Sequence, residues 1–458
     1  MFGIVGIILG LLLLVYLSYK GYSIIWVAPV SGLLVAIIGF GFDGRAILNS
    51  YLKGYMPALG AFAQSYFPLF FLGAVFGKLM EITGSANAVA LILVRIVGAK
   101  RALLAVIISC GILTYGGVSL FVVVFAIYPL AISLFREANL PRRLIPGAIA
   151  LGAFTFTMTA FPGAPQLNNI IAGQNFNTTP YAAPILGIIA GLIMFFGGYF
   201  YLLWKQNKII KNGEHFSEPS VEVVLRDSNQ LPSPILSIIP LIVVIISLYL
   251  FIKFVFKDLT PAEAVIPGSV LSLLCGIICT VIFNFNMLVG KSKDGKSSNG
   301  LIRALNEGGN GSVMAILNTA AAVGFGGVVK IVPGFKLLTD ILLGMKASPL
   351  ISEGIAITLL AGATGSSSGG MGIALTALAP QYLEMAKLSG LSPETLHRIA
   401  TVASGGLDSL PHCGAVLTLL AVTGMTHKDS YNDIGMVTCI LPIVALAAII
   451  VLGTIGVV

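Results

Sequence analysis

Long uncharged apolar runs constrain this 458-residue chain more than any other feature of its sequence. Runs of about 20 such residues recur from end to end, and each is long enough to cross the ~30 Å hydrocarbon core of a bilayer. Only 10% of the residues are charged, whereas soluble domains average roughly 25%. Because lipid offers the backbone no hydrogen bonds, such runs must be helical. The sequence therefore predicts an all-α polytopic membrane protein.

The apolar runs divide the chain into two halves around a polar linker. Full spans are expected at residues 3–19, 23–40, 58–80, 183–204, 235–256, 262–288, 311–330 and 434–456, with amphipathic pieces at 86–98 and 335–346. Residues 205–233 are the most polar part of the chain, and we expect them to form a cytoplasmic linker. The first half is then 1–204 and the second half 234–458.

Each half contains one glycine-rich hairpin and one interrupted helix. The uncharged run 102–135 is too long for one straight span and too short for two, so we predict a re-entrant hairpin with its tip inside the membrane. A second glycine-rich hairpin is predicted at 349–386. Glycine and proline interrupt the segments 144–175 and 394–425, which we predict to be broken transmembrane helices. Freed backbone groups are tolerated at membrane depth only where they line a cavity.

The two halves are predicted to be repeats of inverted topology. A constant spacing of 249 positions relates Phe76 to Phe325, Gly116 to Gly365 and Pro162 to Pro411. With re-entrant hairpins, each half has five crossings, and an odd number inverts the second copy relative to the first. The basic clusters at 100–101, 142–143, 205–211 and 291–296 then fall on one side. The positive-inside rule places that side in the cytoplasm and the N-terminus outside.

Asp408 and His412 are the candidate coupling residues. They stand four residues apart in the second break, beside Gly405, Gly406 and Pro411. Ionisable side chains at membrane depth are costly and mark functional sites by default. Protonation removes the desolvation penalty of a buried carboxylate, so Asp408 is the expected proton carrier and His412 a second titratable group. Sodium is the alternative coupling ion, because unwound carbonyls and hydroxyls also bind Na⁺.

The hairpin tips and helix breaks are expected to meet and to bind a small carboxylate. Helix N-termini suit an anion, and hydroxyls and amides suit a hydroxylated one. No arginine or lysine falls at the tips, so we expect dipoles and hydroxyls to hold the ligand. The expected substrate-binding residues are Tyr115, Gly116, Gly117, Ser119, Thr155, Thr157, Thr159, Asn168, Gly365, Ser366, Ser367, Ser368, Gly369 and Ser409.

Two enzyme-like motifs stand in the wrong context. Residues 290–297 satisfy the P-loop pattern, but a membrane span precedes them where a strand is required. Residues 365–369 match G-x-S-x-G, and Ser367, Asp408 and His412 follow a hydrolase order. An intramembrane hydrolase is therefore one alternative, and a passive channel is another. We expect a transporter and not an enzyme.

Composition argues against other ligands and partners. The five cysteines lie in apolar segments without metal spacing, and no cofactor or metal is expected. The net charge of +8 is spread over short loops and forms no basic face, so no nucleic-acid partner is expected. The lipid bilayer, the carboxylate and the coupling ion remain as expected partners.

The sequences around the two breaks resemble a known family. Residues 154–166 are similar to the first broken-helix signature of the gluconate permease (GntP) family, and residues 404–412, with 415–420 and 426–431, are similar to its second. The second signature most resembles the D-β-hydroxybutyrate permease branch. The resemblance implies a bacterial inner-membrane symporter of the ion transporter superfamily, carrying small hydroxylated monocarboxylates with protons, as a homodimer. It also implies that the tips and breaks lie at 114–119, 155–168, 364–370 and 404–412.

Overall fold

Helices account for all the regular structure in the described part of the chain. The computed structural model describes residues 2–20, 22–98, 101–219, 231–289, 299–335, 337, 348–411 and 413–458. Within these ranges, six helices are long and apolar enough to cross a membrane: Gly44–Ile82, Pro184–Lys211, Pro234–Val255, Pro261–Phe283, Gly300–Ile331 and His427–Thr454. The expected all-helical, multi-span membrane architecture is confirmed.

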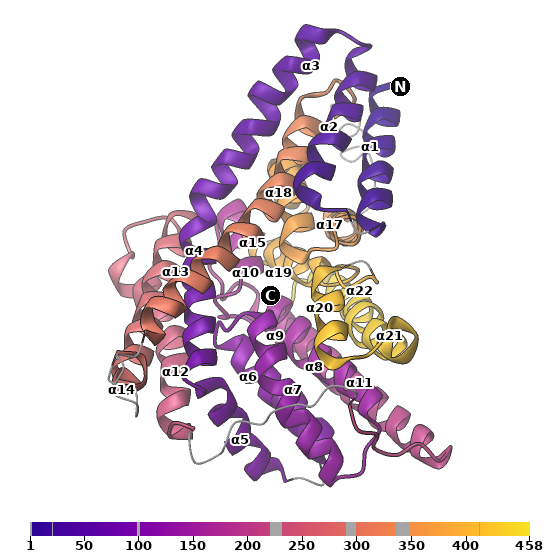
Figure 1. Cartoon of the computed structure of the whole chain (residues 1–458). Helices are drawn as coiled ribbons and strands as arrows, with labels where there is room; N and C mark the ends of the chain where they lie inside the picture. The colour runs from indigo at the N-terminus through magenta and orange to yellow at the C-terminus, as the bar shows by residue number, and fades with distance from the viewer. Residues whose placement is uncertain are drawn as a thin grey trace.

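The first half runs from a helix pair to a hairpin and a broken helix (Figure 1). A single long helix joins α3 to α4 through a π-helical turn at Tyr51–Tyr55. The elements in order are α1 (Phe2–Tyr19), α2 (Ile24–Phe40), α3 (Gly44–Ser50), α4 (Met56–Ile82), α5 (Ser85–Val97), the hairpin α6 (Ala102–Tyr115) and α7 (Leu120–Glu137), the broken helix α8 (Ile145–Phe154), α9 (Phe156–Thr159) and α10 (Leu167–Phe176), and α11 (Pro184–Lys211).

The second half repeats this order of elements. A helix pair comes first, and a long helix, a hairpin and a broken helix follow it. The elements are α12 (Pro234–Leu250), α13 (Pro261–Phe283), α14 (Phe285–Leu288), α15 (Gly300–Ile331), the hairpin α17 (Pro349–Thr364) and α18 (Ser367–Leu388), the broken helix α19 (Pro393–Ser404) and α20 (Gly414–Thr423), α21 (His427–Gly435) and α22 (Leu441–Thr454). Most of the amphipathic piece expected at 335–346 and the P-loop-like residues 290–297 lie outside the described residues.

One membrane helix, α15, is longer than the apolar span expected from the sequence, and ion pairs stabilise its added turns. The span expected at 311–330 begins at Gly300. Arg303 and Glu307 in these added turns pair at 2.6 Å, and Glu307 also lies 2.9 Å from Lys78 of α4. Charges four residues apart stabilise a helix that leaves the apolar layer. Hydropathy does not detect such polar turns, which is why the expected span was short.

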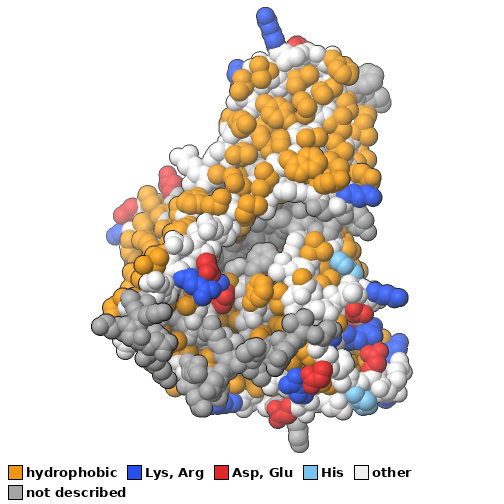
Figure 2. Space-filling view, viewed as in Figure 1, with side chains coloured by type: hydrophobic (Ala, Val, Ile, Leu, Met, Phe, Trp, Pro, Cys, Tyr) orange, Lys and Arg blue, Asp and Glu red, His pale blue; other side chains and the backbone are white. Residues whose placement is uncertain are grey.

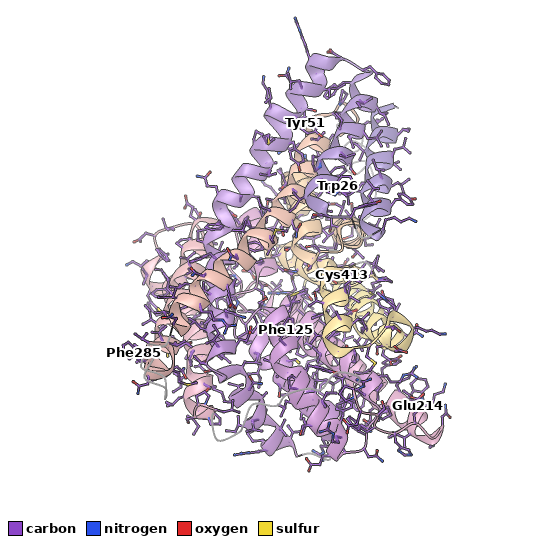
Figure 3. The ribbon with its side chains drawn as sticks, in the orientation of Figure 1. Trp26, Tyr51, Phe125, Glu214, Phe285 and Cys413 are labelled. Carbon is purple, nitrogen blue, oxygen red and sulfur yellow. The ribbon has the colours of Figure 1, made fainter. Side chains whose placement is uncertain are left out.

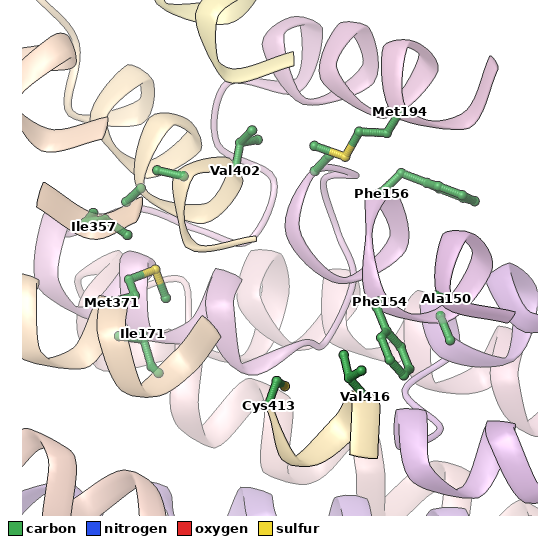
Figure 4. Packing of buried hydrophobic residues seen from close by; sticks show 14 of the residues in the cluster. Ala150, Phe154, Phe156, Ile171, Met194, Ile357, Met371, Val402, Cys413 and Val416 are labelled. Atoms are coloured by element: carbon green, nitrogen blue, oxygen red, sulfur yellow. The ribbon is translucent and has the colours of Figure 1, made fainter. Parts of the chain in front are cut away.

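Corresponding helices of the two halves pack against each other in both directions, first half on second and second half on first. α2 packs against α15 and α13 packs against α4, while α10 packs against α18 and α20 packs against α7. In Figure 4, Ile171 of α10 lies beside Met371 of α18, and Phe154 of α8 beside Val416 of α20. The second segment of each broken helix, α10 or α20, therefore packs against a hairpin helix of the other half. This exchange brings segments more than 200 residues apart into one core.

The surface has the character of a lipid-facing protein. Hydrophobic side chains dominate the face over α1 to α4 in Figure 2, with a few charged side chains at its ends and others in small groups elsewhere. Large apolar side chains such as Trp26, Leu48 and Leu52 are more than two-fifths exposed there. A soluble monomer rarely exposes so large an apolar area. Lipid is the medium that accommodates it.

Gly370→Ala is expected to destabilise the second hairpin by about 2 kcal/mol, the usual range for overpacking. A Cβ at Gly370 would lie 2.2 Å from the backbone nitrogen of Ala361, so the two arms must move apart. Thermal unfolding in detergent measures the loss. Gly60→Ala is the matched control, because nothing lies within 4 Å of a Cβ there. Equal melting temperatures for the two variants would contradict this packing.

Candidate functional site

Each hairpin tip contacts the break in its own half. In the first half, Tyr115 donates a hydrogen bond from Oη to the carbonyl of Pro162 at 2.7 Å, and Gln166 donates to the carbonyl of Thr114 at 2.5 Å. In the second half, Thr358 of α17 donates to the carbonyl of Ala403 at 3.0 Å. Each hairpin is therefore hydrogen-bonded to the broken helix of its own half.

Glycine is required at both tips by the backbone. Gly117 has φ +93° and Gly365 has φ +59°, which are left-handed conformations that side chains disfavour. Gly116 has a packing reason, since a Cβ there would lie 2.6 Å from the Leu241 side chain of α12. Ser366 caps α18 by accepting the N–H of Gly369 at Oγ, at 3.1 Å, and a Cβ on Gly369 would lie 3.0 Å from that Oγ. These contacts explain the glycines structurally.

Three buried polar side chains join the second tip to both breaks. Asn168, at the start of α10, donates from Nδ2 to the hydroxyls of Ser367 and Ser404, the latter at 2.7 Å. Ser367 donates to Ser404 at 2.9 Å, and Ser404 donates to the carbonyl of Thr401 at 2.6 Å. We call Asn168, Ser367 and Ser404 the amide–serine cluster. It is closed to solvent in this conformation.

The two breaks also touch each other directly. A Cβ on Gly405 would lie 3.0 Å from Cγ2 of Thr159, so a glycine is needed for this approach. The hydroxyls of Thr155, Thr157 and Thr159 donate to the backbone carbonyls of Leu151, Gly152 and Thr155, at 2.6, 2.9 and 3.1 Å. These donors are therefore occupied, and only the hydroxyl lone pairs are left for a ligand.

The first tip stays apart from the second in the hydrogen-bond network. Among the described residues, the side-chain hydrogen bonds of residues 114–119 go to the first break, and none goes to 364–370. Asn168, Ser367 and, through Gly405, Thr159 are the expected residues that come together. Ser119 precedes α7, and Ser368 lies in the first turn of α18.

Arg398 of α19 is the largest fully buried side chain, and sequence reasoning missed it. Its five N–H donors are satisfied by neutral oxygens. Nη1 donates to the carbonyl of Ala160 and to Asn169 Oδ1, both at 3.0 Å, and Nη2 donates to the carbonyl of Ala182 at 2.6 Å. Longer bonds run from Nε to Ala182 and from Nη2 to Pro180. The guanidinium thus ties α19 to the first break.

The charge of Arg398 has no carboxylate at ion-pair distance among the described residues. We expected dipoles and hydroxyls to hold the ligand because no arginine or lysine falls at the tips. Arg398 lies on α19, outside both tips, and adds a buried positive charge beside the first break. The signal was present, because an arginine in a segment expected at membrane depth satisfies the same rule that selected Asp408.

Asn169 connects Arg398 to a buried histidine. His397 Nε2 lies 3.3 Å from Asn169 Oδ1, and Nδ1 lies 2.6 Å from Thr178 Oγ1. An amide oxygen only accepts, so this network places a proton on Nε2, and Nδ1 forms its hydrogen bond with the hydroxyl of Thr178. His397 acts as a structural partner of the arginine.

Asp408 is buried in the second break with few partners. It is 6% exposed, and Ser409 Oγ donates to Oδ1 at 2.9 Å. Tyr431 of α21 donates a hydrogen bond to the carbonyl of Ser409 at 3.2 Å, and this bond connects α21 to the second break. No described cation lies within ion-pair distance of Asp408. His412 lies outside the described residues.

Three helices begin at the first hairpin tip and the two breaks without a side-chain cap. α7, α10 and α20 begin after Ser119, Gln166 and Cys413, and none of these residues caps its helix with a side chain. Cys413 is buried, and Figure 3 places it in the middle of the molecule. Uncapped N–H groups carry positive partial charge. Together with the guanidinium of Arg398, they are sources of positive charge beside the first tip and the two breaks.

The fold is that of a membrane transporter. Over 90% of this chain and 89% of the other, it superposes on the YdaH transporter of Alcanivorax borkumensis with a TM-score of 0.54 at 14% identity. MtrF of Neisseria gonorrhoeae, from a class of antimetabolite efflux pumps, gives a TM-score of 0.51 at 15% identity, covering 91% of this chain and 85% of that one. At these identities the likeness concerns the fold alone.

The sequence comparisons identify the family. The chain belongs to the GntP family of permeases, whose model matches residues 2–455. It is 40% identical over 480 residues to the uncharacterized transporter YxjC of Bacillus subtilis, covering 99% of both chains. A segment of 179 residues, 38% of each chain, is 30% identical to the Gnt-II system L-idonate transporter of Escherichia coli. The protein is a multi-pass secondary transporter.

The hydrolase alternative is wrong, since the chain is a permease and not an enzyme. The local structure gives the reason that the motif misleads. Ser367 opens helix α18 directly after Ser366, with a helix rather than a strand before the turn. Its hydroxyl bonds Asn168 and Ser404 and so lacks a described general base.

Proposed function

We propose that this permease carries a small hydroxy-monocarboxylate into the cell together with protons. The observation that carries the proposal is the meeting of both breaks and the second tip around buried Asn168, Ser367 and Ser404, next to an arginine without a carboxylate partner. Permeation requires these groups to exchange their mutual hydrogen bonds for bonds to a substrate. A hydroxylated anion offers matching donors and acceptors.

The substrate charge follows from the electrostatics of the centre. Arg398 and the N-termini of α7, α10 and α20 favour an anion. The arginine's donors are fully used, so it attracts a carboxylate through its field while the substrate's direct partners are amides and hydroxyls. The L-idonate transporter relative is named for a hydroxylated carboxylate. Within this class, we favour a short acid like 3-hydroxybutyrate over gluconate, because the amide–serine cluster offers the side chains of three residues for hydrogen bonds.

Asp408 is the proposed proton carrier. Ser409 is the side chain that donates to it, so its ionised form is poorly compensated in a buried position. Neutralisation by a proton removes that cost. Sodium is the rival coupling ion, and His412 remains a proposed second titratable group. Uptake at fixed pH with and without sodium separates the two ions: proton coupling predicts equal rates.

Ligand-induced stabilisation tests the substrate class. A ligand at 100 times its Kd stabilises the folded state by about 2.7 kcal/mol. We expect purified protein to melt at a higher temperature with 3-hydroxybutyrate or gluconate, and citrate to have no effect. Uptake of the stabilising acid into proteoliposomes, against its gradient, then distinguishes a transporter from a passive channel. Stabilisation by none of the hydroxy acids would contradict the proposal.

Topology and assembly complete the proposal. We propose that the halves 1–204 and 234–458 are inverted repeats, that the hairpins 102–135 and 349–386 are re-entrant, and that the linker 205–233 is cytoplasmic. The exchanged packing of α10 with α18 and of α20 with α7 supports the repeats. The N-terminus then lies outside the bacterial inner membrane, and the protein forms a homodimer. Cysteine labelling at residue 22 and in the linker, from outside intact cells, tests the orientation.

Ser367→Ala is expected to lower substrate affinity about tenfold while the protein still folds. The change deletes one hydroxyl of the amide–serine cluster and leaves Asn168 with one fewer acceptor, which costs about 1–3 kcal/mol for a buried group. Equilibrium binding measures the effect. Ser269→Ala is the matched control, because that buried hydroxyl only donates to the Val265 carbonyl on α13. A similar affinity loss in both variants would point to general destabilisation.

A further inference from the structure

A buried carboxylate in the second hairpin, away from the two helix breaks, has no hydrogen-bond partner among the described residues. Glu353 of α17 is 0% exposed, and both of its carboxylate oxygens lack a partner among the described residues. It lies 11 positions before Thr364, the last residue of α17, which corresponds to about 16 Å along a helix. Glu353 therefore belongs to the base of the second hairpin, whereas Asp408 belongs to the second break.

The hydroxyls closest to Glu353 are unpaired as well. Tyr382 of α18 interacts electrostatically with Glu353 and lies within reach of Ser352. Tyr382 Oη and Ser352 Oγ are both buried, and neither has a hydrogen-bond partner at standard geometry among the described residues. Three unsatisfied polar groups in one apolar region are unusual, since nearly all buried polar groups are paired. Such an exception calls for a role.

The surroundings offer no charge to balance an ionised Glu353. α22, which packs against α17, carries no ionisable residue, and its Ile450 and Leu446 approach Gly354. On α19, His397 and Arg398 bond to residues 160–182, and Glu394 accepts from Ala183. α1 contributes Tyr16, which is exposed. On α18, Glu384 and Lys387 are exposed, and Tyr382 is a buried titratable group that interacts with Glu353.

We propose that Glu353, with Tyr382 and Ser352, is a second proton-binding site, separate from Asp408. An unpaired carboxylate in apolar surroundings is far more costly than a neutral acid. The protonated carboxyl can donate to a neighbouring hydroxyl, and the hairpin must move to bring it to water for release. This inference rests on the proposed proton symport and raises the number of protons carried per substrate from one to two.

The accumulation ratio in proteoliposomes counts the protons. With the membrane potential clamped at zero and a pH difference of one unit, a monoanion carried with n protons accumulates about 10ⁿ-fold, because each tenfold ratio corresponds to about 1.4 kcal/mol. We expect about 100-fold for the wild type and about tenfold for Glu353→Gln, with unchanged substrate exchange at equal pH. Glu353→Asp, which keeps an ionisable group, is expected to remain near 100-fold.

The outcomes separate this inference from the proposed function. A wild-type ratio of about tenfold, or a Glu353→Gln ratio equal to the wild type, overturns the second site and leaves proton symport intact. A wild type that does not accumulate substrate overturns the proposed function itself. If Glu353→Gln does not fold, the wild-type ratio still decides whether a second proton is carried: a ratio near 100-fold supports it, and a ratio near tenfold excludes it.

Discussion

Arg398→Lys is expected to lower kcat/KM for transport about 100-fold and to lower the melting temperature. A lysine has three donors on one nitrogen, so it cannot reach the carbonyls of Ala160 and Ala182 together with Asn169. Each acceptor left buried and unpaired costs about 1–3 kcal/mol. Two such losses correspond to about 100-fold when they loosen the first break, where the substrate is proposed to bind.

Initial rates of uptake in proteoliposomes over a range of substrate concentrations measure this loss. Arg303→Lys is the matched control, because Arg303 is exposed and makes one ion pair with Glu307. Exposed pairs of this kind contribute about 0–1 kcal/mol. Transport by Arg398→Lys at the wild-type rate would show that the guanidinium network does not position the first break.

Asp408→Asn is expected to reduce proton-driven accumulation at least tenfold per unit of pH difference. The amide is nearly isosteric with the acid but cannot take up and release a proton. Substrate exchange at equal pH should continue, because the break keeps its shape and Ser409 keeps an oxygen acceptor. The accumulation ratio and the exchange rate, measured on the same vesicles, give both results.

Asp433→Asn provides the control for Asp408→Asn. Asp433 is also buried, but it accepts from Tyr201 at 2.8 Å and lies 3.6 Å from Lys205. Its ionised form is therefore compensated, and its loss should lower stability without changing the accumulation ratio. An Asp408→Asn ratio equal to the wild type would remove Asp408 from the coupling mechanism.

Local sequence features predicted the elements that interrupt the helices. Gly117 marked the first turn, Gly365 marked the second, and Pro162 and Pro411 marked the breaks. These residues act on their own backbone, through left-handed φ angles or a missing N–H, so their effect is readable without neighbours. The sequence did not predict that α15 begins as early as Gly300 or that α11 continues to Lys211, because polar helical turns carry no hydropathy signal.

Side-chain direction limited the prediction of the site. Thr155, Thr157 and Thr159 were chosen for their hydroxyls, but helical geometry turns those donors onto carbonyls one turn earlier. Asn168 was chosen for its amide, and that amide hydrogen-bonds both serines of the amide–serine cluster. Residue type alone did not distinguish these two cases.

By itself, the sequence determined a helical membrane protein with two hairpins and two interrupted helices, because span length and backbone breaks are properties of short segments. Only the tertiary structure decided which of those segments meet. Asn168 reaches serines 199 and 236 positions away, and Arg398 finds its acceptors more than 200 positions earlier in the chain. Contacts at such separations depend on how whole helices pack, and no local pattern encodes them.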